Sequence, residues 1–255
     1  MKSKSINLVL SLLLMATVFL NIPDVGGAAM WIGGQGGVNF VADGDVKYSP
    51  ALGTDRLKNV KSDPAFIGGI IIGYDFVKDG FLGYDWPKWM KYFSVAIDLT
   101  YNNFNQPAQD VQAQELPRRT RKRQFNIHID AAHGYILELS LLFMAKYGFF
   151  PTAELPFGRL IPYVGVGPGL IFSVVNTDRG FNFYPSSDSL EPGFFAEAGI
   201  RYMILRHVSL DAAFRYRYVY PSYDRSYFTN IGPYVSPGRI VAQSFNAIFR
   251  VNYHF

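Results

Sequence analysis

Ten consecutive residues decide the fold: Phe93-Ser94-Val95-Ala96-Ile97-Asp98-Leu99-Thr100-Tyr101-Asn102. Large apolar side chains occupy every second position, and small or polar side chains occupy the positions between them. A period of two places these two sets on opposite faces of a β-strand. Sustained over about ten residues, this pattern is typical of a strand that crosses a membrane, with apolar side chains toward lipid and polar ones toward a barrel lumen.

The same alternation recurs along the chain and predicts eight strands. They occupy residues 30–42, 64–77, 88–104, 135–149, 157–175, 193–205, 207–220 and 240–255. Long polar connections alternate with shorter ones, as outer-membrane barrels alternate external loops with periplasmic turns. We therefore predict an all-β fold, an eight-stranded antiparallel up-and-down transmembrane β-barrel. The alternation of Phe125, Ile127 and Ile129 also allows the fourth strand to begin near Gln124.

The composition favours this reading over a helical membrane protein. The chain has 255 residues, 16% of them aromatic and none of them cysteine, and its mean hydropathy is only +0.07. A membrane-spanning helix needs about 20 consecutive apolar residues, and the one long apolar run is shorter. A soluble β-sandwich or lipocalin-like barrel is the main alternative fold. Such a protein buries its apolar face inward and carries its charges outside.

The N-terminus has the pattern of a secretory signal peptide. Lys2 and Lys4 precede the apolar run, residues 6–20, and the small residues Gly26-Gly27-Ala28-Ala29 follow it. This order is typical of a segment cleaved after export. We expect a signal peptide over residues 1–28 and a barrel domain over 29–255. An uncleaved N-terminal anchor is the alternative.

Three stretches resemble a known family, the small OmpA-like outer-membrane barrels. Leu160-Ile161-Pro162-Tyr163-Val164-Gly165-Val166-Gly167-Pro168-Gly169 is similar to one of that family's strands, and residues 210–218 resemble its penultimate strand. The last strand resembles the family's C-terminal assembly signal in four outward residues: Phe249, Val251, Tyr253 and Phe255. The resemblance implies the outer membrane of a Gram-negative bacterium, periplasmic termini and contact with the barrel-assembly machinery. The chain ends at this strand, so a periplasmic wall-binding domain is not expected.

The polar faces of the predicted strands carry charges of both signs. The predicted lumen charge network comprises Asp75, Asp98, Glu138, Lys146, Arg159, Glu197, Arg201, Asp211, Arg215, Arg217 and Arg250. Basic residues are in slight excess. Charges in so narrow a lumen must pair, because an isolated buried charge is too costly to desolvate. We expect a salt-bridged plug, with a narrow polar or anion-selective conduit as the alternative.

The densest charge run lies in the third connection. Five of its six residues are cations: Arg118, Arg119, Arg121, Lys122 and Arg123. Arginine matches the geometry of phosphate, and lipopolysaccharide is the nearest large source of phosphate at a bacterial surface. These five residues are candidate lipopolysaccharide or anion ligands, and a solvated loop is the alternative. A nucleic-acid partner is not expected on a cell surface.

The catalytic patterns in the sequence are sparse. His207 and Ser209 have a His-x-Ser spacing similar to that of lipid A deacylases, but they fall at the periplasmic end of a strand. His128, Asp130, Ser173 and Ser244 are predicted near outer strand ends, and whether they converge is open. No metal-ligand spacing, phosphate loop or dinucleotide fingerprint is found. We therefore expect no catalytic site, no metal and no cofactor.

Three functions from different classes remain open. The first is a non-enzymatic outer-membrane barrel that stabilises the envelope or binds ligands, lipopolysaccharide included, through its long loops. The second is a narrow pore for small solutes, and the third is a lipid-A-modifying enzyme. The first is our prediction, and the sequence leaves the ligand and the oligomeric state open.

Overall fold

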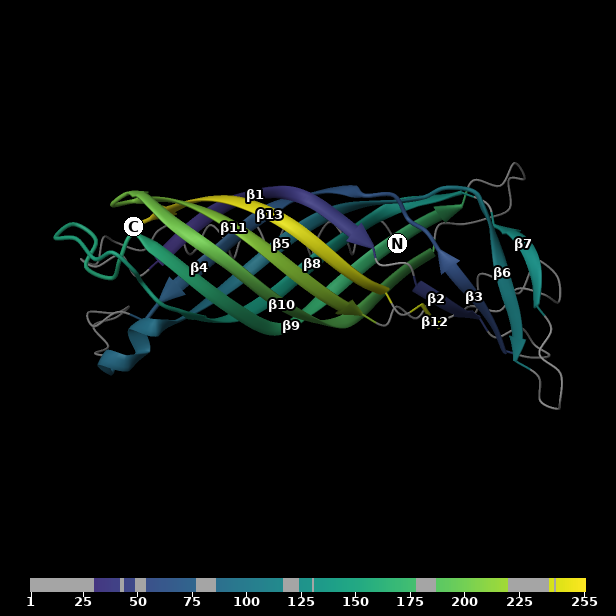
Figure 1. Cartoon of the computed structure of the whole chain (residues 1–255), viewed down its shortest axis with the longest axis horizontal. Coiled ribbons are helices and arrows are strands. Elements are labelled where there is room, and N and C mark those ends of the chain that lie inside the picture. Colours follow the sequence, from purple (N-terminus) through teal and green to yellow (C-terminus); the bar gives the residue numbers. More distant parts are fainter. Residues whose placement is uncertain are drawn as a thin grey trace, which may run out of the picture.

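The computed structural model describes residues 30–41, 44–48, 54–76, 86–116, 124–129, 131–177, 187–219, 239–240 and 242–255. Eight antiparallel strands form a closed barrel (Figure 1). Around the barrel they follow the order β1 (Met30–Val41), β13 (Ala242–His254), β11 (Val208–Val219), β10 (Ser187–Leu205), β9 (Leu160–Thr177), β8 (Ala132–Lys146), β5 (Phe93–Gln106) and β4 (Ala65–Asp75). The predicted eight-stranded barrel is therefore confirmed.

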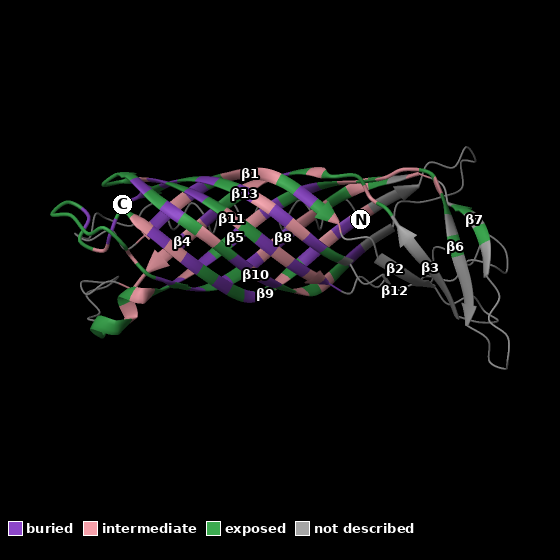
Figure 2. Ribbon diagram, viewed as in Figure 1, coloured by how far each residue is buried: buried purple, intermediate pink, exposed green. Residues whose placement is uncertain are grey.

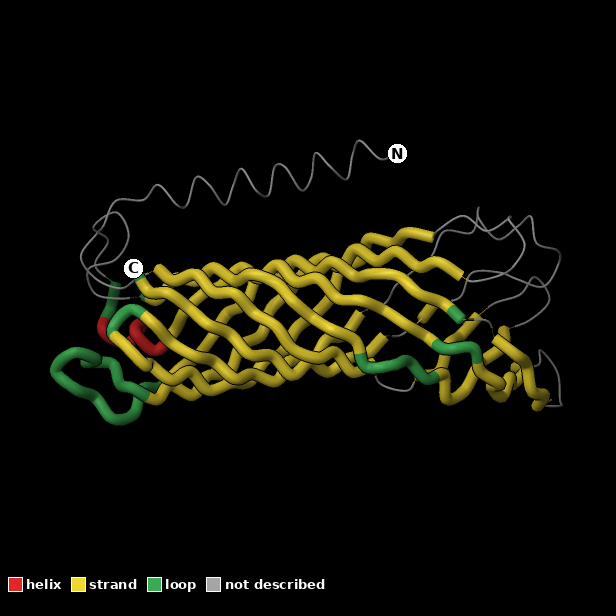
Figure 3. Tube along the Cα trace, turned by 90° about the horizontal axis from the view of Figure 1, so that it is seen from above, coloured by secondary structure: helices red, strands yellow, loops and turns green. Residues whose placement is uncertain are grey.

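The first and last strands close the barrel. β1 pairs on one side with β13, where Gln35 faces Arg250, and on the other with β4, where Gln35 faces Gly69. The Phe255 amide donates a hydrogen bond of 3.0 Å to the Met30 carbonyl oxygen. This hydrogen bond places the beginning of β1 and the end of β13 at the same end of the barrel. Figure 3 shows η2 and the β8–β9 connection at that end as well; we call it the turn end and its opposite the mouth.

Burial alternates along the strands with the predicted period (Figure 2). Inward positions are mostly polar, and Asp98, Thr100 and Arg215 are fully buried. Outward positions are apolar and exposed, among them Phe66 at 61%, Phe143 at 53% and Phe249 at 70%. A soluble protein rarely exposes so extensive an apolar surface. Polar side chains inside and apolar side chains outside are the arrangement of a transmembrane barrel. This arrangement excludes the soluble lipocalin-like alternative.

The strand predicted over residues 88–104 begins later than expected. Residues 88–92 belong to a short 3₁₀ helix, η2 (Lys88–Tyr92), which leads into β5. The prediction of strand from residue 88 is therefore wrong, because strict alternation begins only at Phe93, beyond the Lys-Trp-Met-Lys-Tyr run. In the described segments no helix is both long and apolar enough to cross a membrane.

A second sheet stands beyond the mouth of the barrel, where the sequence predicts only long connections (Figure 1). It has five antiparallel strands in the order β12 (Arg239–Ile240), β2 (Gly44–Tyr48), β3 (Thr54–Val60), β6 (Gln109–Leu116) and β7 (Gln124–Ile129). Three different connections of the barrel supply these strands. Gln124–Ile129 therefore pairs with β6 outside the barrel, and the fourth barrel strand begins at Ala132 rather than near Gln124.

Candidate functional site in the barrel lumen

The centre of the lumen is filled by a cluster of paired charges. Arg250 forms two hydrogen bonds with the Glu197 carboxylate, at 2.5 and 2.7 Å. Arg215 donates from its Nε to the same carboxylate at 2.8 Å and from its Nη1 and Nη2 to Asp98 at 3.2 and 2.6 Å. The Tyr163 hydroxyl donates to Glu197 at 3.2 Å and accepts from Arg250 at 2.9 Å. Arginine forms strong bidentate bonds of this kind with carboxylates.

The strand register explains why these side chains meet. Arg215 and Glu197 are cross-strand neighbours on β11 and β10, whereas Asp98 lies on β5 across the lumen. Gln35 on β1 completes the bridge, because its amide donates to Asp98 at 2.9 Å and its oxygen accepts from Arg250 at 2.7 Å. The cluster therefore ties opposite walls together and occupies the cross-section of the barrel.

A second cluster closes the turn end. Lys146 contacts Asp75 at 2.6 Å, and the Trp31 indole donates to the same carboxylate at 3.2 Å. Arg201 makes three hydrogen bonds of 3.0 to 3.2 Å with Asp211. Its guanidinium also lies 4.2 Å from the centroid of the Trp31 ring, a cation–π contact. Gly73 leaves room for this indole, since a Cβ there would lie 2.1 Å from Trp31.

The layer nearest the mouth is less completely paired. Arg217 forms an ion pair with Glu138, which also accepts from the Asn102 amide at 2.5 Å. The Asn246 amide group and the Ser244 hydroxyl are buried without a hydrogen-bond partner among the described residues. Buried polar groups are ordinarily hydrogen-bonded, with ordered water as the usual partner where the protein supplies none. This layer is therefore suited to hold water above the paired charges.

The structure brings ten of the eleven predicted lumen charges together inside the barrel. They are Asp75, Asp98, Glu138, Lys146, Glu197, Arg201, Asp211, Arg215, Arg217 and Arg250. Arg159 is exposed in the turn before β9, so its prediction as a lumen residue is wrong. Arg159 precedes the first residue of β9, so the alternation of inward and outward side chains along the strand does not apply to it. These ten residues comprise five acids and five bases, so the basic excess of the predicted set disappears.

Of the four polar residues whose convergence was left open, the three that the structure describes do not form one site. His128 lies on β7 in the second sheet, exposed, with its ring 2.8 Å from Asp110. Ser173 and Ser244 are instead buried inside the barrel. Asp130 lies outside the described residues, as do the cations Arg118, Arg119, Arg121, Lys122 and Arg123 and the predicted signal peptide.

The His-x-Ser pair also separates. His207 is exposed in the β10–β11 turn, and its Nδ1 lies 2.9 Å from the His254 carbonyl oxygen. Ser209 points inward and meets a different histidine, since its hydroxyl lies 3.0 Å from Nε2 of His254. Ser209 is fully buried and His254 nearly so. Among the described residues no cluster of histidines and acids is suited to hold a metal.

Several lumen residues were not singled out from the sequence. Gln35, Tyr163 and Trp31 all form hydrogen bonds with the charged groups of the lumen. The alternation of side chains along each strand could have identified Gln35 and Tyr163, because each lies on the inward face of its own strand. Trp31 could not be found that way, because its neighbours Met30 and Ile32 are also apolar. The four residues of the predicted assembly signal face outward, with Phe249 the most exposed.

Comparison with solved structures finds outer-membrane proteins of low sequence identity. The outer membrane protein OprG from Pseudomonas aeruginosa is similar with a TM-score of 0.48 and 15% identity, over 89% of this chain and 97% of that one. Neisserial surface protein A has a TM-score of 0.45 and 13% identity, over 90% and 98%. The outer membrane protease OmpT from Escherichia coli has 0.41 and 10%, over 89% and 97%. No protein-family model and no curated protein matches the sequence. These likenesses concern the fold alone.

Proposed function

We propose that the chain is a non-enzymatic outer-membrane barrel with a closed lumen, and that it acts through the surface beyond its mouth. One observation carries this proposal: the barrel is apolar outside and filled inside by balanced, paired charges. In this arrangement the turn end and both chain termini of the barrel domain lie on the periplasmic side of the membrane. The second sheet lies on the outer side. The barrel-assembly machinery would then recognise the outward-facing residues of β13.

The lumen favours a structural role over a pore. Arg215 and its two carboxylate partners have fully buried side chains and span the barrel from β5 to β10. An ion moving through would have to break these pairs, and breaking a buried pair costs about 3–5 kcal/mol. The ten paired charges balance, so this cluster has no net charge to attract either kind of ion.

The surface beyond the mouth is the better candidate for binding. A sheet built from three connections can hold the loops between its strands close together, and loops on a structured scaffold commonly carry function. The cationic run Arg118–Arg123 belongs to the connection between β6 and β7. We propose that it binds phosphate groups of lipopolysaccharide, which makes lipopolysaccharide the first partner to test.

The experiment compares lipopolysaccharide binding by the purified full-length barrel and by a variant in which Arg118, Arg119, Arg121, Lys122 and Arg123 are all glutamine. We expect at least about tenfold weaker binding, since each cation near an anionic surface contributes about 1 kcal/mol. The matched control is Arg159→Gln with Arg206→Gln, two exposed cations at the turn end. Equal weakening by both variants, or none by the first, would refute the binding proposal. Recovery of the protein in the soluble periplasmic fraction would refute the membrane location.

A further inference from the structure

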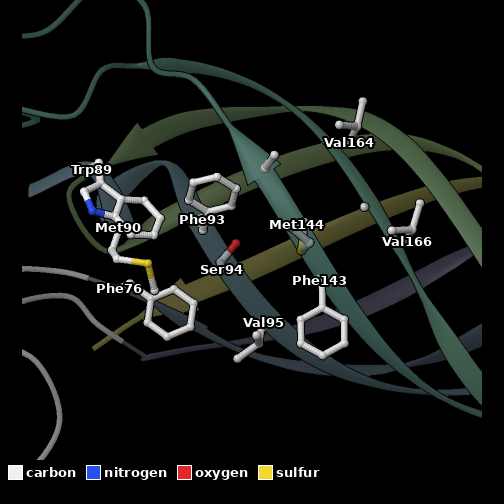
Figure 4. Close-up of a pocket in the computed structure, with 12 residues that line it drawn as sticks. Phe76, Trp89, Met90, Phe93, Ser94, Val95, Phe143, Met144, Val164 and Val166 are labelled. Carbon is white, nitrogen blue, oxygen red and sulfur yellow. The ribbon is translucent and has the colours of Figure 1, made fainter. Parts of the chain in front are cut away.

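An apolar groove runs along the outer wall of the barrel beside η2 (Figure 4). It encloses about 470 Å³. Figure 4 shows Phe76, Trp89 and Met90 on one side of it and Phe143, Val164 and Val166 on the other. The groove therefore lies between the 3₁₀ helix and the lipid-facing surface of β8 and β9.

The wall formed by η2 is held by aromatic contacts. Trp89 packs edge-to-face on Phe93, with ring centroids 5.8 Å apart, and Phe76 packs similarly on Trp86 at 4.9 Å. Trp89 nevertheless remains 60% exposed. Tryptophan and tyrosine prefer the membrane–water interface, so these rings put the groove at the level of the lipid headgroups.

Two cations stand directly beside this groove. Lys88 and Lys91 are exposed on η2, on either side of the lining residues Trp89 and Met90. A 3₁₀ helix has three residues per turn, so these lysines share one face, about 6 Å apart along the axis. Among the described residues, Asp75 at the end of β4 is engaged inside the lumen by Lys146. The amine of Lys91 also lies over the Tyr92 ring, 5.1 Å from its centroid. The two exposed lysines therefore give η2, next to the groove, a local positive charge that suits an anionic headgroup.

We propose that this groove binds one phospholipid with an anionic headgroup, with an acyl chain along the apolar lining and its phosphate next to Lys88 and Lys91. The inference rests on the proposed function for the presence of the barrel in a membrane. The occupant is a phospholipid of the leaflet that meets the turn end.

A second groove on the adjoining wall shows what the lysines add. It encloses about 440 Å³ and is lined by uncharged residues of β9, β10, β11 and β13, among them Ile200, Phe214 and Phe249. Any acyl chain can lie in such a groove, with no preference among headgroups. The cations of η2 therefore make the first groove selective for an anionic lipid.

The test is native mass spectrometry of the refolded full-length barrel, titrated with phosphatidylglycerol or with phosphatidylcholine of the same acyl chains. We expect one phosphatidylglycerol to bind roughly tenfold more tightly than phosphatidylcholine. The double variant Lys88→Gln with Lys91→Gln removes this preference without changing phosphatidylcholine binding, whereas Arg206→Gln at the same end retains it.

Filling the groove tests the acyl-chain site. Val164→Trp is expected to weaken the binding of both lipids at this site, and Val251→Trp is its matched control, because both valines are 58% exposed and Val251 lies on the opposite wall. Folding of each variant is checked by its heat-shifted gel mobility, and Val166→Trp replaces a variant that does not fold. A folded wild-type barrel with no headgroup preference, or equal losses in the lysine variant and Arg206→Gln, would overturn the inference. Neither result bears on the closed lumen or on location, which are measured by conductance and fractionation.

Discussion

At the scale of single residues, Glu197 joins two arginines and a tyrosine into one cluster. Its carboxylate accepts from Arg215 and from Arg250, so the substitution Glu197→Gln leaves two buried guanidiniums short of negative charge. Removing one partner of a buried ion pair costs about 3–5 kcal/mol. We therefore expect Glu197→Gln to lower the free energy of unfolding by about 3 kcal/mol, measured by urea titration in detergent with the heat-shifted gel mobility as the readout.

The same substitution at Glu154, which is exposed in the β8–β9 connection, is the control and should change the free energy of unfolding by less than about 0.5 kcal/mol. Equal effects at the two positions would mean that the central cluster does not stabilise the barrel.

Much of this site was predictable from the sequence, because inward parity alone selects Asp98, Glu197 and Arg250. Two features were not. Which acid pairs with which base depends on the shear of the barrel, as in the contact of Arg215 with Asp98 across the lumen. Arg159 was misplaced because parity has no meaning one residue before a strand begins.

At the scale of elements, the second sheet depends on β3 (Thr54–Val60), which pairs with both β2 and β6. Replacing residues 44–60 by a short Gly-Ser linker leaves β6 and β7 as a two-stranded hairpin, which is marginal in water. The barrel strands β1 and β4 pair directly and keep their register. We expect unchanged heat-shifted mobility but faster cleavage within residues 109–129 in limited proteolysis.

Failure of that deletion variant to assemble would show that the second sheet supports the barrel itself. The strands of the second sheet were not predicted because their partners are remote in the sequence. For example, Thr54 pairs with Leu116. The alternation after Gln124 was recognised but assigned to the wrong sheet, since parity identifies a strand without identifying its neighbour.

At the scale of the whole molecule, a barrel with an apolar outside and a charged inside carries a second sheet beyond its mouth and a 3₁₀ helix at its turn end (Figure 1). Ion pairs across the lumen connect the two halves of the wall, and lipid surrounds the apolar outside. The barrel and its lumen follow from alternation along single strands, whereas the sheet and the groove arise from contacts between distant segments.

The central claim, a lumen closed by paired charges, is tested most directly by single-channel recording of the purified full-length barrel in a planar lipid bilayer. We predict no steady current above the lipid background at either polarity, because the charges of Asp98, Glu197, Arg215 and Arg250 fill the cross-section. A reproducible open-channel conductance from protein whose folding is verified by its gel mobility would contradict the closed barrel and favour the narrow pore.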